Sequence, residues 1–86
     1  MKLTKTEIDV LLVTIRHNRR EWRFGQCVFN FGSVYPIIEQ YRATKYDPFH
    51  NDAIVLSLFE LILDNTAAQH WYSTEEFKQL VDQINS

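Results

Sequence analysis

The chain has 86 residues, and among them are one cysteine, two glycines and two prolines. A single Cys27 excludes a disulfide scaffold and a cysteine-based zinc module, and it fits a reducing compartment. So few glycines and prolines exclude a collagen-like or low-complexity chain, and they leave no phosphate-cradling loop. The net charge of −2 is too small for an acidic disordered chain or a basic nucleic-acid-binding tail.

Long apolar segments are also missing. The longest apolar runs, Val10–Val13 and Ala53–Leu56, fall far short of the roughly 20 residues that span a bilayer. Met1–Lys5 is followed by an amphipathic stretch and not by the apolar core of a signal peptide. We therefore expect a cytoplasmic protein without membrane contact. The length predicts one domain, residues 1–86.

Hydrophobic residues make up 45% of the chain, and most of them recur with the period of a helix. Four stripes follow the i, i+3, i+4, i+7 spacing: Ile8, Leu11, Leu12 and Ile15; Phe24, Cys27, Val28 and Phe31; Val34, Ile37, Ile38 and Tyr41; Phe77, Leu80, Val81 and Ile84. A further segment, residues 52–63, is apolar almost all round, which is typical of a buried helix. The predicted fold is all-α: a single domain of about five short helices packed around the central helix 52–63.

Local signals predict where helices begin and end. Thr4 with Glu7, and Ser73 with Glu76, have the spacing of a capping box. Gly32 is expected to end the second helix in a left-handed conformation, and Ser33 to cap the third.

Connections are expected at residues 46–52 and 64–71. Gly25 lies inside a predicted helix, where glycine costs about 1 kcal/mol relative to alanine. Its presence indicates either a close contact with another backbone or a helix that starts near it.

The residues suited to chemistry show no ligand spacing or catalytic motif. His50 lies near Asp47 and Asp52, but in a loop where Asp and Asn usually bind their own backbone. Cys27 lies on an apolar stripe, where burial makes a thiol inert. We expect no metal, no cofactor and no catalytic residue. A small enzyme using Cys27 or His50 is a distant alternative that requires an accessible Cys27 with a lowered pKa.

Charge is distributed unevenly along the chain. Residues 1–45 carry eight Lys/Arg and four Asp/Glu, a net of +4, whereas residues 46–86 carry one Lys and seven Asp/Glu, a net of −6. Within the basic half, cations and one aromatic ring gather in a short cluster: Arg16, Arg19, Arg20, Trp22 and Arg23. The two halves could pair their charges with each other, or the cluster could bind an acidic partner.

Part of the sequence resembles a family of small bacterial and phage proteins. The resemblance rests on Trp22–Gln26 and Phe29-Asn30, followed by Asp47-Pro48-Phe49 and Asp52; it covers roughly residues 20–60. Those proteins carry an "R-aromatic-G-Q…N" segment and then "D-P-F-aromatic-x-D", and His50 stands here where the pattern has an aromatic residue. The resemblance implies a compact helical accessory protein from a mobile element, and it brings no reaction or ligand with it.

The leading hypothesis is a non-enzymatic protein-interaction module, such as a phage accessory protein that inhibits or redirects a host protein. Its partner would present an acidic surface to Arg16, Arg19, Arg20 and Arg23, and Trp22 would supply buried area. The alternative is nucleic-acid binding through the same cluster, against which the overall acidity argues. An exposed Trp22, or Trp71 with Tyr72, would also provide a self-complementary patch for a dimer.

Overall fold

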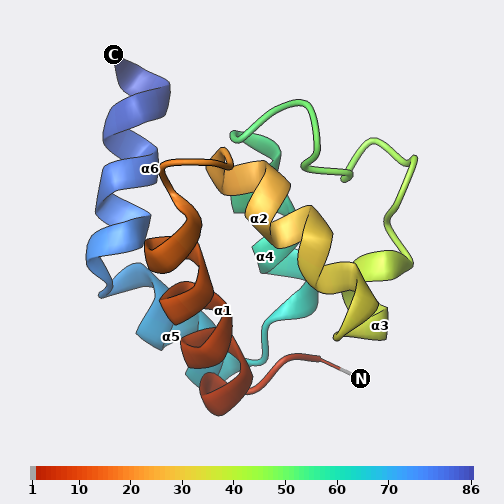
Figure 1. Ribbon diagram of the computed structural model, residues 1–86. Helices are drawn as coiled ribbons and strands as arrows, with labels where there is room; N and C mark the ends of the chain where they lie inside the picture. Colours follow the sequence, from red (N-terminus) through yellow and green to blue (C-terminus); the bar gives the residue numbers. More distant parts are fainter. Residues whose placement is uncertain (1) are drawn as a thin grey trace.

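The computed structural model describes residues 2–86, so that Met1 of the predicted domain lies outside the described residues. The described chain is all-α, as predicted (Figure 1). Its elements are α1 (Lys5–Asn18), α2 (Phe24–Asn30), the 3-10 turn η1 (Phe31–Ser33), α3 (Pro36–Glu39), α4 (Ile54–Ile62), α5 (Asn65–Tyr72) and α6 (Glu75–Asn85). Within residues 2–86 no helix is long and apolar enough to cross a membrane.

The first helix begins as the sequence predicts. The Thr4 side chain accepts a hydrogen bond from the Glu7 N–H, and the Glu7 carboxylate accepts one from the Thr4 N–H. The whole predicted stripe of α1 is buried. Leu3, just before the cap, also forms an isolated parallel bridge with Leu63, which fixes the entry of the chain beside the link between α4 and α5.

The core is centred on an aromatic cluster around Trp71 of α5. Trp71 is 1% exposed, and its ring centroid lies 4.8 Å from that of Phe59, 5.3 Å from Phe77 and 6.0 Å from Phe24. The prediction that Trp71 could belong to an exposed dimer patch is therefore wrong, although Tyr72 is exposed. The reason is that residue 71 lies on a helix whose inner face points into the core.

Helix α5 was not predicted, because residues 64–71 were expected to be a connection. Asp64 caps this helix by accepting a hydrogen bond from the Ala67 N–H at 2.8 Å. The predicted capping box of the last helix is also wrong by one residue. Thr74, not Ser73, caps α6 through the Phe77 N–H, while the Ser73 hydroxyl donates to the His70 carbonyl at the end of α5.

The third predicted helix is shorter than its apolar stripe. Gly32 lies in η1 without a positive φ, so the predicted left-handed cap is wrong, and Ser33 is part of the same turn and caps nothing. Proline disfavours helical backbone in the residue before it, and Tyr35 accordingly is extended, with φ −115° and ψ 102°. Helix α3 therefore starts afresh at Pro36 and ends before Tyr41.

Helix α4 supplies four buried side chains to the core: Val55, Leu58, Phe59 and Ile62. In Figure 1 it lies behind α2. Its burial is not complete, because Leu61 remains exposed. So few helices cannot cover every face of a helix that is apolar all round.

Gly25 marks the closest approach between α2 and the 47–53 segment. A Cβ atom at this position would lie 2.1 Å from the Pro48 carbonyl oxygen and 3.0 Å from Asp52 Oδ1. The helix also starts one residue before it, at Phe24. Both expectations for Gly25 are therefore confirmed, and only a residue without a side chain lets the two segments meet.

We predict that Gly25→Ala lowers the free energy of unfolding by about 2 kcal/mol. The backbone must shift to make room for the methyl group, and the cost of this shift exceeds the gain in helix propensity. Urea denaturation followed by circular dichroism measures the change. Gly32→Ala is the control, since its Cβ would come too close only to the flexible end of Glu39, while the Glu39 backbone would stay at an ordinary contact distance of 3.5 Å. Equal effects of the two substitutions would contradict this account of Gly25.

Candidate functional site

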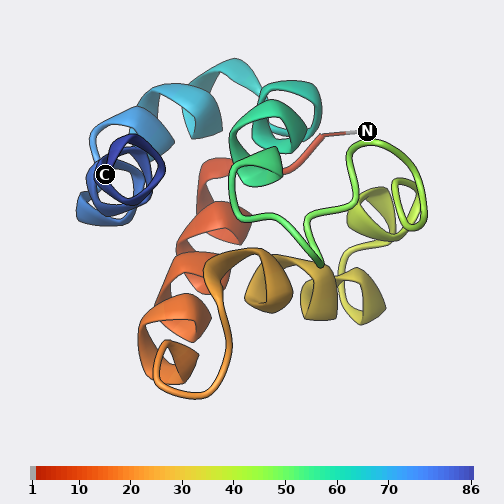
Figure 2. The same cartoon turned by 90° about the horizontal axis from the view of Figure 1, so that it is seen from above.

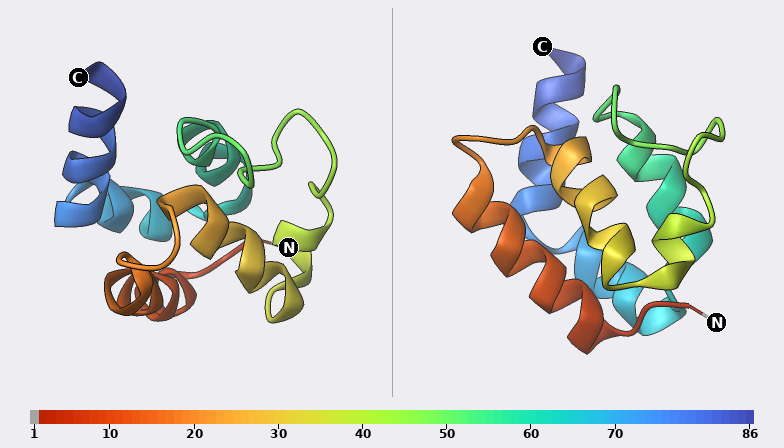
Figure 3. Two further views of the ribbon diagram at one scale, coloured as in Figure 1. Left: turned by 45° about the horizontal axis from the view of Figure 1, so that its top comes forward. Right: turned by 45° about the vertical axis from the view of Figure 1, so that its right-hand side comes forward.

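The predicted basic cluster lies together at one end of the molecule. We call Arg16, Arg19, Arg20, Trp22 and Arg23 the arginine corner; it comprises the last turn of α1 and the connection into α2. Figure 3 shows α1 and α2 side by side, joined by this connection at one end. The end of α1 carries the partial negative charge of the helix dipole, which favours arginines there.

The strongest contact of the arginine corner is with Glu76 on α6. Arg16 donates two hydrogen bonds, from Nε and Nη2, to the two carboxylate oxygens of Glu76, both at 2.8 Å. Glu76 is 4% exposed, whereas the Arg16 side chain is 53% exposed. Such a two-bond pair is directional as well as strong, and it fixes α6 against the end of α1. The bonds from Arg16 lower the pKa of Glu76.

The next two arginines differ in their surroundings. Arg19 Nη1 donates to the amide oxygen of Gln79, one turn further along α6 than Glu76. Arg20 is exposed and makes no hydrogen bond or ion pair with residues 2–86. Trp22 is half-buried and packs against the core, so only part of its ring is free to contact a partner.

Arg23 joins the arginine corner to a buried carboxylate on the other side of α2. Its Nη1 lies 3.2 Å from Oδ1 of Asp52, and its Nη2 donates to the Phe49 carbonyl. Asp52 is 8% exposed and also accepts hydrogen bonds from the Gly25 N–H at 2.8 Å and from Gln83 Nε2 at 2.7 Å. The one carboxylate therefore connects α2, the 47–53 segment and α6.

These contacts give a physical reason for the sequence pattern that carries the family resemblance. Arg23 and Gly25 contact Asp52 and Pro48, and the Phe29 and Phe49 rings meet edge to face at 4.8 Å. The pattern therefore describes how α2 is joined to the following loop.

Two arginines of the cluster thus pair with acids of the C-terminal half, as one of the two sequence interpretations proposed. The pairing does not cover the arginine corner, because the side chains of Arg16 and Arg23 remain 53% and 48% exposed. The corner accordingly keeps partly exposed arginine side chains next to the exposed Arg20.

Of the two residues considered for enzymatic chemistry, Cys27 lies on α2, and His50 lines the same depression as Arg23 and Asp52. Cys27 is buried, and this burial, together with the charge of Asp52, raises the pKa of its thiol. The condition for a cysteine enzyme, an accessible thiol of lowered pKa, is not met. His50 is exposed and stacks edge to face on Phe49.

Asp47 and Asn51 bind backbone N–H groups, as expected for this loop. Asp47 accepts from Phe49 and from Ala43, the described non-glycine residue with a left-handed φ of 61°, and Asn51 accepts from Ala53. No group of three or more His, Cys, Asp or Glu among residues 2–86 could hold a metal ion.

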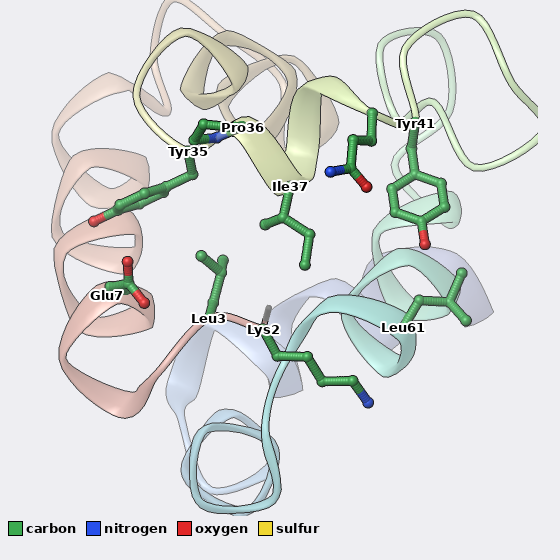
Figure 4. Close-up of a pocket in the computed structure, with 9 residues that line it drawn as sticks. Lys2, Leu3, Glu7, Tyr35, Pro36, Ile37, Tyr41 and Leu61 are labelled. Atoms are coloured by element: carbon green, nitrogen blue, oxygen red, sulfur yellow. The ribbon is translucent and has the colours of Figure 1, made fainter.

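A second surface feature is an apolar groove between the N-terminal segment, α3 and the end of α4. Its volume is about 460 Å³, and its lining is Lys2, Leu3, Glu7, Tyr35, Pro36, Ile37, Gln40, Tyr41 and Leu61. Figure 4 shows Leu3 and Ile37 facing each other in its middle, with Tyr35 and Glu7 on one side and Leu61 on the other. The space is sufficient for one apolar side chain of another molecule. Its lining holds no cluster of catalytic groups.

Sequence reasoning missed the partners of the arginines: Glu76 was assigned to a capping box, and Asp52 was placed where the loop meets the central helix. Gln79, which accepts a hydrogen bond from Arg19, and Gln83, which donates one to Asp52, were not considered. A signal for Glu76 exists, because it lies four residues before Leu80 and so faces the same side of α6. The sequence gives no such signal for Asp52. Its position just before an apolar helix also suits a capping residue, and only the folded structure shows Arg23 and Gly25 beside it.

Neither a protein-family model, nor a curated protein, nor a solved structure matches this chain. The resemblance to small bacterial and phage proteins therefore stays a prediction.

We predict that acid weakens the fold partly through Glu76. The pKa of this carboxyl is lowered in the folded state from its ordinary 4.5, so its stabilising effect is complete above pH 4.5 and is lost as the pH falls through the lowered pKa. At pH 7, Glu76→Gln should lower the free energy of unfolding by about 2 kcal/mol. Urea denaturation at a series of pH values should show this difference shrinking with acid. A difference independent of pH, or one equally large for the exposed Glu75→Gln, would contradict the assignment.

We also predict that iodoacetamide modifies Cys27 of the native protein at least about 100-fold more slowly than that of the unfolded chain, because the thiol must first be exposed by opening of the core. Mass spectrometry at timed intervals measures the rates. Modification at the unfolded rate would restore Cys27 as a candidate nucleophile.

Proposed function

We propose that this protein is a non-enzymatic interaction module that binds an acidic surface of another protein through the arginine corner. The observation that carries the proposal is that the corner already binds carboxylates within its own chain. Arg16 holds Glu76 with two hydrogen bonds, and Arg23 holds Asp52. The side chains of these two arginines remain about half exposed, so that acidic side chains of a partner can approach them.

The proposed mechanism is occlusion of the partner's surface. Arg20 and the exposed parts of Arg16, Arg19 and Arg23 would contact carboxylates of the partner, and the accessible edge of Trp22 would add apolar contact area. In line with the family resemblance, we propose a phage or mobile-element accessory protein that inhibits or redirects a protein of its host in the cytoplasm.

Nucleic-acid binding through the same corner is the alternative outcome. It is less favoured because the carboxylates of Glu76 and Asp52 neutralise part of the positive charge that phosphates would need. A phosphate-binding surface would also lose affinity steeply as the salt concentration rises.

The test is capture of partners from host lysate with the tagged protein, with and without nuclease, at low and high salt. We expect a protein that survives nuclease and whose capture is lost with Arg19→Glu/Arg20→Glu. With the purified partner, this variant should associate at least about tenfold more slowly and with a weaker salt dependence.

The control variant Arg42→Glu/Lys45→Glu changes the net charge equally in the same half of the chain, away from the arginine corner. Equal losses for both variants would show a non-specific charge effect and contradict the proposal. Recovery of nucleic acid alone would favour the alternative.

A further inference from the structure

The arginine corner is partly covered by one face of α6. Three polar side chains of this helix, Glu76, Gln79 and Gln83, follow the i, i+3, i+7 spacing and therefore lie on one side. Their partners are Arg16, Arg19 and Asp52 respectively. We call these three contacts the polar seam. It runs almost the full length of α6.

Apolar contacts between α6 and the rest of the molecule are confined to its first half. Leu80 is the one apolar residue of α6 that is buried, and Phe77 reaches the Trp71 ring, 5.3 Å away between centroids. Further along, Ile84 is 39% exposed, and Gln83 and Ile84 line an open depression together with residues 50–53. In Figure 2, α6 is seen end-on at one edge of the molecule. The second half of α6 is therefore held chiefly by the hydrogen bond from Gln83 to Asp52.

The connection between α6 and the rest of the fold is short and simple. Ser73 and Thr74 alone link it to α5, which is the helix it contacts most. Rotation at these two residues would separate α6 from the arginine corner without changing α1 or α2. It would uncover Arg16, Arg19 and the apolar surface beneath Leu80 together.

We propose that the surface beneath α6 is a docking site for an acidic amphipathic helix of a partner protein, and that α6 occupies this site in the free protein. The inference rests on the proposed function, and it specifies the partner's chemistry. The required helix carries a glutamate that binds Arg16 and, three residues later, a side chain that hydrogen-bonds to Arg19. The residue after that is a leucine, which covers the apolar surface. Helix α6 itself, with Glu75, Glu76 and Asp82 against Lys78, has this character.

Such an arrangement limits binding until α6 is displaced. Because α6 is tethered, its effective concentration at the site is in the millimolar range, and a free helix of equal quality competes poorly. A partner helix displaces α6 when it makes better contacts with the surface than α6 does, or when the polar seam is weakened. The α6 contact is in this sense autoinhibitory.

The first experiment titrates a fluorescent peptide of residues 73–86 into the full-length protein and follows its anisotropy. Glu76→Gln in the protein weakens the tethered helix but leaves Arg16 in place, so it should bind the peptide about tenfold more tightly than wild type. Glu75→Gln is the matched control and should bind like wild type. A peptide that itself carries Glu76→Gln should not show this tenfold gain in affinity for the Glu76→Gln protein.

The second experiment needs no variant: amide hydrogen exchange of the wild-type protein compares α6 with α1. We expect the amides of α6 to exchange at least about tenfold faster than those of α1, because α6 opens on its own. Equal exchange, or a folded Glu76→Gln protein that binds the peptide no better than Glu75→Gln, would overturn the inference. A partner that requires Arg19 and Arg20 but is not displaced by the peptide would also overturn it, and would leave the proposed function standing.

Discussion

The position of α2, of the 47–53 segment and of the end of α6 depends on a single carboxylate, that of Asp52. A charge buried to this extent is tolerated only when hydrogen bonds replace its water. Here Gly25, Arg23 and Gln83 each donate one, and they come from two helices and the connection between α1 and α2. The hydrogen bond from the Gly25 N–H brings α2 so close to the 47–53 segment that a Cβ atom at residue 25 would lie 2.1 Å from the Pro48 carbonyl oxygen. The apolar core supplies most of the burial, but this carboxylate determines how three parts of the chain meet.

How much of the fold could be predicted from the sequence depends on whether the signal for each element lies within one segment of the chain. The apolar stripe and the capping box of α1 follow from side-chain period and capping within one segment, and there the predictions are confirmed. Helix α5 was missed because its only strong local signal is the cap residue Asp64, and its core residue Trp71 stands in no apolar stripe. The cap of α6 was misplaced by one residue because Ser73 and Thr74 are adjacent and both residue types cap helices; in the structure the Ser73 hydroxyl is bound to the His70 carbonyl instead.

The arginines of the candidate site could be predicted from the sequence, but the acids that bind them could not. Four arginines within eight residues are visible in any reading of the chain, and the opposite charge of the two halves indicated internal pairing. Which acids take part depends on the packing of α6 and on the loop that precedes α4. The basic cluster and the acidic helix α6 are thus two parts of one surface. A partner that binds the arginines competes with the protein's own carboxylates.

The contacts of the N-terminal segment have a kinetic consequence. The Leu3 N–H donates to the Ile62 carbonyl, and its own carbonyl accepts from the Asp64 N–H, so the start of the chain is fixed only after α4 has formed. Arg16 and Glu76 are likewise 60 residues apart in sequence. Helical domains usually fold fast because their contacts are local, but each of these contacts closes a loop of most of the chain. The individual helices can therefore form early, while the native arrangement waits for the N-terminal segment and α1 to meet residues 62–76.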